Sequence, residues 1–240
     1  MTKKEKQIVA NGETPRPECD LTATGKEQEK ESGAARCNEE TGLKPKGRLE
    51  ADRTRGQRLN LSCKQKMKIG TWNVRSMQSG KMNIIQREMK RLEISIMGLS
   101  ETRWKGQGHF NWNGYKIIMS GQAEKGRNGV AVMCDRASAN AMMGYDTVSD
   151  RILSVRFRGR KVNITIIQVY APTSTASEEE QDNFFIKLQS TIDRTPKGDV
   201  TMVIGDFNAK VGHHKGGDGD TIGRHGLGKQ NEAGERLVEF

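Results

Sequence analysis

Five polar residues, each at the end of a short apolar stretch, have side chains of the types that bind a divalent cation or an anion. They are Asn73, Glu101, Tyr170, Asp206 and Asn208. Mg²⁺ takes oxygen ligands and commonly only one or two carboxylates from a protein, while amides and phenols hydrogen-bond anions. Polar groups at successive strand ends therefore favour a site on one rim of a sheet.

The clearest example is the apolar run 200–204, which stops at a glycine and is followed at once by Asp206 and Asn208. Side chains alternate along an extended strand, so these two polar groups are expected to point the same way while Phe207 turns into the core. Gly, Asp and Asn are also common in turns, so an ordinary surface turn is the alternative.

The other three residues have structural alternatives as well. Asn73 can cap the helix region that follows it, and Tyr170 can be an amphipathic strand residue. Glu101 can form a surface ion pair with Arg103. The occurrence of all of them at successive strand ends is hard to obtain by chance, which favours one shared site.

The spacing of apolar residues predicts a mixture of short strands and helices. Apolar runs predict strands over 68–72, 94–99, 115–119, 129–133, 152–156, 162–170 and 200–204. Helical spacing predicts helices over 79–93, from 178 to near Pro196, and over 231–240. Capping boxes are expected at Asn83–Gln86 and at Ser177–Glu180. Together these elements predict an α/β sandwich.

The composition predicts one folded domain behind an unfolded tail. Only 33% of the 240 residues are hydrophobic and 5% are aromatic, which is low for a chain packed along its whole length. Residues 1–66 hold few apolar and many charged residues, so we expect a disordered basic tail there and a folded domain over 67–240. The net charge of +10 favours a polyanionic partner, either nucleic acid or an acidic membrane surface.

The N-terminus and the cysteines predict an intracellular protein. No run of 18 apolar residues is present and no apolar segment follows Met1, so we expect neither a membrane span nor secretion. The four cysteines lack CxxC spacing, which favours a reducing compartment and disfavours zinc. Basic residues crowd 44–68 and can bind phosphates or act as a nuclear address, although a solvated linker is equally compatible.

Four short motifs carry a family resemblance. Thr-Trp-Asn73, Ser-Glu101-Thr-Arg-Trp, Val-Tyr170-Ala-Pro-Thr and Gly-Asp206-Phe-Asn208-Ala resemble, in order, the motifs of the exonuclease-endonuclease-phosphatase family with the DNase I-like fold. More narrowly, the sequence is similar to the apurinic-type endonuclease domain of non-LTR retrotransposons of the RTE kind. The resemblance covers 67–240. It implies a four-layer sandwich in which two mixed sheets are flanked by helices.

The resemblance also implies a reaction and a role for each residue. The reaction is Mg²⁺- or Mn²⁺-dependent hydrolysis of a phosphodiester by a DNA endonuclease. Glu101 would be the principal metal ligand, with Asn73 beside it. Asp206 would orient or deprotonate the attacking water, Asn208 would hold that water or a phosphate oxygen, and Tyr170 would donate its phenolic proton toward the phosphate.

DNA is the expected partner, and RNA stays open as an alternative. Lys105, Lys125 and Arg127 lie in loops after the second and third predicted strands, near the expected rim, where they can contact phosphates. The loop rich in glycine and histidine after Lys210 matches neither a metal-ligand spacing nor a phosphate cradle. We therefore expect no small-molecule cofactor, and the basic charge and the resemblance count against a membrane partner.

The family pattern continues past the printed sequence. Members carry a further metal-linked Asp and a Ser-Asp-His motif near the C-terminus of the domain, and neither is present in these 240 residues. We therefore expect a domain incomplete at its C-terminus, with impaired activity, because loss of one member of a catalytic group commonly costs orders of magnitude in rate. The alternative function is a non-catalytic nucleic-acid-binding or interaction protein derived from such a domain.

Overall fold

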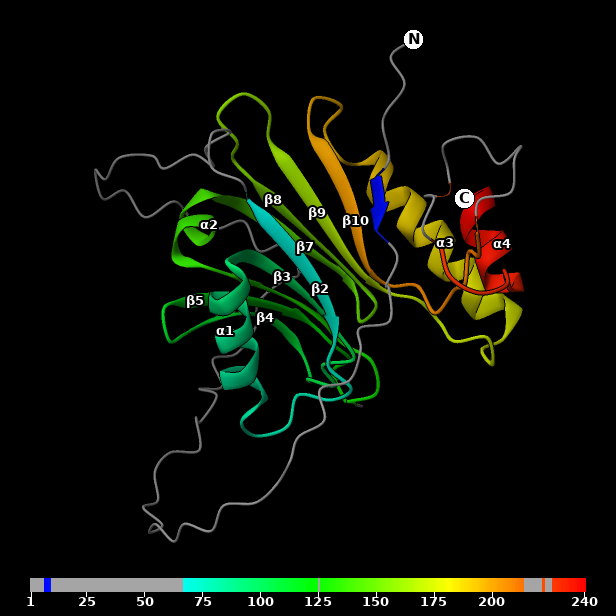
Figure 1. The fold of residues 1–240 in the computed structure, drawn as a ribbon, viewed down its shortest axis with the longest axis horizontal. Coiled ribbons are helices and arrows are strands. Elements are labelled where there is room, and N and C mark those ends of the chain that lie inside the picture. Colours follow the sequence, from blue (N-terminus) through cyan, green and yellow to red (C-terminus); the bar gives the residue numbers. More distant parts are fainter. Residues whose placement is uncertain (1–6, 10–66, 125, 214–221, 223–225) are drawn as a thin grey trace, which may run out of the picture.

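Two five-stranded sheets lie face to face in the computed structural model, with helices on their outer sides (Figure 1). The structure describes residues 7–9, 67–124, 126–213, 222 and 226–240. The tail predicted to be disordered lies outside these residues except for β1 (Gln7–Val9), a short strand that the sequence analysis did not predict.

One sheet, here called the β2–β3 sheet, contains the first predicted strand. In order across the sheet its strands are β2 (Lys68–Asn73), β3 (Ile94–Ser100), β6 (Val130–Cys134), β5 (Tyr115–Ser120) and β4 (Gln107–Trp112). β2 and β3 are parallel, whereas β3, β6, β5 and β4 pair antiparallel. The sheet is therefore mixed, as predicted.

The other sheet, here called the β9–β10 sheet, is built in the same way. Its strands are, in order, β1, β10 (Val200–Asp206), β9 (Ile164–Tyr170), β8 (Ile152–Phe157) and β7 (Met142–Ser149). β10 pairs parallel with β9 and with β1, and β9, β8 and β7 pair antiparallel. Each sheet thus contains a parallel pair whose carboxyl ends share one edge.

The helices cover the outer faces of the two sheets. α1 (Lys81–Leu92) buries Ile85 and Met89 against the β2–β3 sheet. α3 (Glu178–Asp193) and α4 (Glu232–Glu239) cover the β9–β10 sheet, mainly through Phe184, Leu188 and Leu237. The short α2 (Arg136–Ala141) connects β6 to β7. The predicted α/β sandwich, with two mixed sheets flanked by helices, is confirmed.

The core between the sheets explains why the layers stay together. Ile96 and Val132 from one sheet meet Val155 and Ile166 from the other, and all four side chains are fully buried. Burial of each such aliphatic side chain contributes about 1.5–3 kcal/mol to folding. Among the described helices none is both long and apolar enough to cross a lipid bilayer.

The start of α1 differs from the prediction. The helix begins at Lys81 after Gly80, a left-handed residue that gives no side-chain cap, so the capping box expected at Asn83–Gln86 is wrong. The ammonium of Lys81 instead binds carbonyl oxygens of the preceding loop, which fixes the start of the helix by a tertiary contact. The second expected box is confirmed, because the Ser177 hydroxyl accepts a hydrogen bond from the Glu180 amide at 3.3 Å.

Candidate active site

The two parallel strand pairs bring the polar strand ends together. Asn73 is the last residue of β2 and lies opposite Ser100, directly before Glu101. Asp206 is the last residue of β10 and lies opposite Tyr170, the last residue of β9. Because β10 also contacts β2 and β3 across the interface between the sheets, the two pairs of strand ends meet at one rim.

Asn73 joins two carboxylates that come from different sheets. Its Nδ2 donates to Glu101 Oε1 at 2.6 Å and to Asp206 Oδ2 at 2.6 Å. Its Oδ1 accepts from the backbone amide of Arg75 at 3.0 Å, which fixes which way the amide faces. Two negative groups are thereby held close together, an arrangement that attracts a cation.

Tyr170 borders this pair of carboxylates. Burial and the negative charge of Glu101, whose carboxylate accepts a hydrogen bond from the phenol, raise the pKa of Tyr170, and the Arg151 cation opposes this rise only in part. The raised pKa means that the phenol keeps its proton at neutral pH. Tyr170 can therefore act as a hydrogen-bond donor in this site.

Asn208 lies in a tight turn directly after β10. Its backbone amide donates to Asp206 Oδ1 at 3.0 Å and its Nδ2 donates to the carbonyl oxygen of Ala171 at 2.8 Å. Its φ of 49° is left-handed, so the extended alternation expected after Asp206 stops there. Phe207 is buried, as predicted. The turn and the pair of polar groups, treated as alternatives in the sequence, are thus both present.

Left-handed backbone conformations gather at this rim. Glu101 (φ 56°), Asn208 (φ 49°) and Arg75 (φ 45°) all have positive φ although none is a glycine. Such conformations cost about 1–3 kcal/mol each and persist where the surroundings impose them. Here the loops after β2 and β3 remain paired, because the Ser76 amide donates to the Glu101 carbonyl at 2.7 Å.

A buried polar contact fixes one sheet to the other beneath the rim. Gln168 Nε2 donates to Ser100 Oγ at 2.9 Å, and the Ser100 hydroxyl donates to the Val169 carbonyl at 3.2 Å. Both polar side chains are fully buried. In such an environment an unpaired partner would be costly, so this contact fixes the relative position of the two strand ends.

The predicted DNA-contacting residues lie in loops that flank Glu101. Lys105 and Arg127 are exposed, and the loops that carry them are joined by a 2.8 Å hydrogen bond from the Arg103 amide to the Asn128 carbonyl. Lys125 lies outside the described residues.

The donors at the rim fit a hard divalent cation. Mg²⁺ needs only one or two protein carboxylates and fills its other positions with water or phosphate oxygens, and Glu101 and Asp206 supply two. The described part of the chain contains no cluster of three or more His, Cys, Asp or Glu side chains that could hold a metal. A site made only of protein ligands, such as structural zinc requires, is therefore not formed by these residues.

One residue of the site was not identified from the sequence. The guanidinium of Arg151 lies over the Tyr170 ring, 5.2 Å from its centre, and its side chain is 16% exposed. The sequence shows only an arginine next to a predicted strand. Only the tertiary structure identifies this residue, because the partners of Arg151 come from β9 and α3.

Comparisons with known proteins identify the family of this chain. The model of the Endonuclease/Exonuclease/phosphatase family matches residues 70–237. Craniofacial development protein 2 of Bos taurus is 44% identical over 218 residues, which cover 91% of this chain and 36% of that protein. The protein of the same name from Tragulus javanicus is 43% identical over 233 residues, 97% of this chain and 40% of that protein. This chain therefore spans about two fifths of the length of these relatives.

Among solved structures, the endonuclease domain of TRAS1, a telomere-specific non-LTR retrotransposon, is 14% identical, with a TM-score of 0.49 over 72% of this chain and 70% of that one. Since the family's sequence model spans nearly all of the folded region, including the rim that holds Asn73, Glu101, Tyr170 and Asp206, this chain belongs to the Endonuclease/Exonuclease/phosphatase family.

Proposed function

We propose that this chain hydrolyses phosphodiester bonds in DNA with the help of Mg²⁺ or Mn²⁺, as an endonuclease domain of retrotransposon origin. The observation that carries the proposal is the Asn73 amide, which holds the Glu101 and Asp206 carboxylates together at 2.6 Å each. Family membership supports the reaction class. The motif around Asp206 supports the retrotransposon origin.

Glu101 would hold the cation, with Asn73 fixing the direction of its carboxylate. When bound there, the cation would neutralise charge on a phosphate oxygen and help to orient the substrate. The amide of Asn73 offers its two protons to carboxylates, so its part in this arrangement is to position the ligands.

The protein groups around the carboxylates would handle the water and the leaving charge. Asp206 can accept a proton from the attacking water or orient it. Asn208 would hold that water or a phosphate oxygen after a small change in its contact with Ala171. Tyr170, which keeps its proton, would redirect its phenol from Glu101 to the phosphate and stabilise the developing negative charge.

Positive charge around the rim would hold the nucleic acid. Lys105 and Arg127 are exposed in loops next to Glu101, and Lys125 lies in the same loop sequence as Arg127. Such contacts make binding weaken steeply with salt.

The basic run over 44–68 would act as a nuclear address. The localisation of fluorescent fusions with and without these residues would measure this.

Nicking of supercoiled plasmid by the purified chain tests this proposal. We expect weak nicking with Mg²⁺ or Mn²⁺, none in EDTA, and a loss of at least about 100-fold in Glu101→Gln. Glu88→Gln, which removes a carboxylate of α1 that pairs with Arg91, is the matched control and should nick like the parent.

Two other results have a defined meaning. Salt-dependent DNA binding in EDTA without any nicking would replace the proposal by a non-catalytic nucleic-acid-binding protein. Preferential cleavage of RNA would keep the site and change the substrate. A chain that neither binds nor cleaves nucleic acid would overturn both readings.

A further inference from the structure

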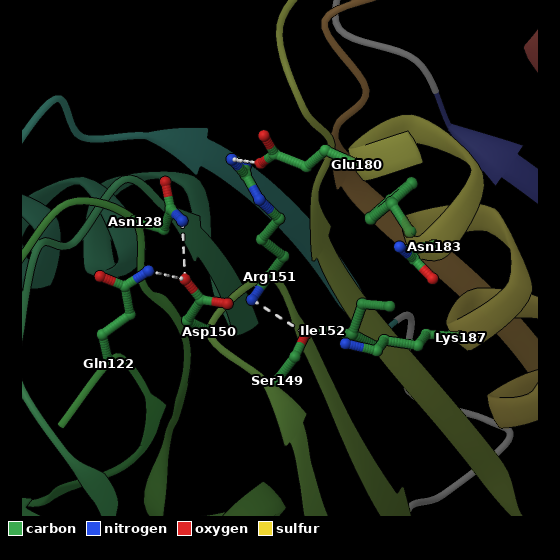
Figure 2. Close-up of a pocket in the computed structure, with 10 residues that line it drawn as sticks. Gln122, Asn128, Ser149, Asp150, Arg151, Ile152, Glu180, Asn183 and Lys187 are labelled. Atoms are coloured by element: carbon green, nitrogen blue, oxygen red, sulfur yellow. Dashed lines mark hydrogen bonds and ion pairs between the residues drawn. The ribbon is translucent and has the colours of Figure 1, made fainter. Parts of the chain in front are cut away.

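A pocket beside Tyr170 is organised around the turn that connects β7 to β8. The turn contributes Asp150 and Arg151, one wall comes from the loop that contains Gln122 and Asn128, and the opposite wall comes from α3 (Figure 2). The two adjacent charged residues of the turn point to different partners, Asp150 toward the loop and Arg151 toward α3.

Arg151 contacts the Tyr170 ring and the backbone at Tyr170 and Ala171. Its Nη1 donates to the carbonyl oxygens of Tyr170 at 3.3 Å and Ala171 at 3.4 Å, while its Nη2 donates to Glu180 Oε1 at 2.8 Å. The guanidinium also lies over the Tyr170 ring. The same Ala171 carbonyl accepts from Asn208, so one cation is connected to both Tyr170 and Asn208.

Asp150 holds the loop on the other side of the pocket. Its Oδ2 accepts from Gln122 Nε2 at 2.8 Å and from Asn128 Nδ2 at 2.6 Å, and its carbonyl oxygen accepts from the Gly129 amide at 3.0 Å. Arg127 lies between the two amide side chains in the sequence. A single carboxylate therefore fixes both ends of the loop that presents Arg127.

We infer that Asp150 and Arg151 are positioning residues with separate tasks, Arg151 orienting Tyr170 for the chemical step and Asp150 orienting the basic loop for binding of the nucleic-acid backbone. The inference rests on the proposed function. The two tasks are distinct because the two side chains contact opposite walls of the pocket. The described contacts of Asp150 do not include Tyr170.

Steady-state kinetics of the full chain test the two tasks. Arg151→Met should lower kcat about tenfold or more with KM changed less than about twofold, because an interaction used in the chemical step is lost. Asp150→Ala should raise KM several-fold with kcat nearly unchanged, because the phosphate-contacting loop is released. Arg151→Lys should recover part of kcat, and Asp150→Asn should recover part of the binding.

Two matched controls separate positioning from general stability. Arg156→Met removes another ion-paired arginine at the opposite end of β8, and Asp146→Asn removes a carboxylate from β7 away from the pocket. Both should keep the parent values of kcat and KM. If Asp150→Ala and Arg151→Met instead change kcat and KM in the same proportion, the division of tasks is wrong.

A readout without turnover keeps this test independent of nuclease activity. The chain has three tyrosines, so labelling only their Cζ atoms with ¹³C gives three NMR signals that Tyr→Phe substitutions assign. At pH 7 and without metal, Arg151→Met should move the Tyr170 signal alone, Arg151→Lys should restore it, and Asp150→Ala should leave it in place.

The same spectra contain the result that would overturn the inference. An unchanged Tyr170 signal in Arg151→Met, or equal shifts at all three tyrosines, would assign Arg151 to general packing. If the parent chain shows no nuclease activity but Tyr170 alone responds to Arg151, the proposed function fails while the positioning of Tyr170 by Arg151 stands. Binding of fluorescent DNA in EDTA then measures the task of Asp150, which is overturned if Asp150→Ala binds like the parent.

Discussion

At the scale of single residues, Asn73 is the side chain on which the candidate site depends most directly. Its amide group hydrogen-bonds both Glu101 and Asp206, which come from different sheets. A neutral amide is suited to this place because it donates two hydrogen bonds without adding charge. The carboxylates can then approach each other before a cation is bound.

Replacement of Asn73 by Asp should convert this link into a metal-dependent one. Asn73→Asp loses two charge-assisted hydrogen bonds, each contributing about 1.5–3 kcal/mol, and adds a third negative charge. We expect a lower Tm without metal and a larger rise in Tm on addition of Mg²⁺ than in the parent, because a ligand stabilises the state that binds it. Thermal unfolding with a Mg²⁺ titration measures both.

Asn83→Asp, which adds the same charge on an exposed part of α1, is the control for this prediction. It should show the metal response of the parent. An Asn73→Asp chain that unfolds like the parent, with the same response to Mg²⁺, would show that the amide does not hold the two carboxylates in solution.

At the scale of elements, the loop between β2 and α1 must hold Asn73 still. The ammonium of Lys81 donates to the carbonyl oxygens of Val74 at 2.5 Å and Ser76 at 2.8 Å. A cation in the first turn of a helix opposes the helix dipole, and no acidic residue balances it in that turn of α1. The position of Lys81 is therefore explained by the loop, not by the helix.

Lys81→Met should loosen this loop while leaving the apolar face of α1 unchanged. We expect a loss of about 1–2 kcal/mol in the free energy of unfolding, because the carbonyl oxygens of Val74, Arg75 and Ser76 lose a charged donor. The amides of Val74 and Ser76, which pair with Ser100 and Glu101, should exchange hydrogen faster. Urea unfolding and hydrogen exchange measure these effects.

Lys90→Met, an exposed lysine in the last turn of the same helix, is the comparison. It should leave the exchange of Val74 and Ser76 unchanged. Equal exchange in the parent and in Lys81→Met would mean that the backbone pairing of the loop is sufficient without the ammonium.

At the scale of the whole molecule, the sequence predicted the parts that local patterns determine. The strands β3, β9 and β10 are largely apolar, and the polar residues Glu101, Tyr170 and Asp206 were identified because they lie where these runs end. Phe207 and the cap at Ser177 also follow from local rules. These features depend only on residues that are close together in the sequence.

The features that were missed depend on residues far apart in the chain. β4 is largely exposed and β7 contains a glycine and an aspartate, so neither has a strong strand pattern, and both form because a neighbouring strand pairs with them. The bridge from Asn73 to Asp206 spans 133 residues. Spacing in the sequence does not specify such contacts, and the stacking of Arg151 on Tyr170 is of the same kind.

An ion pair at the opposite end of the β9–β10 sheet should stabilise the fold without affecting the candidate site. Arg156 donates twice to Asp199, at 2.7 and 2.9 Å, and Thr165 donates to the same carboxylate. Burial alone would raise the pKa of Asp199, but these hydrogen bonds outweigh it and hold the pKa below its ordinary value of 3.8.

A lowered pKa in the folded state determines the pH range in which Asp199 stabilises the protein. The unfolded chain binds the proton more tightly, so the contribution of Asp199 to stability is complete above the pKa of the unfolded state and is lost as pH falls through the pKa of the folded state.

Asp199→Asn should therefore lower the free energy of unfolding by about 2 kcal/mol at pH 7, and the difference from the parent should shrink only below about pH 4. DNA binding measured at pH 7 should stay at the parent value, because β8 and β10 carry the site at their other ends. Urea unfolding from pH 3 to pH 7 measures the first expectation, with exposed Asp193→Asn as control; a constant difference across that range would show that Asp199 has no lowered pKa.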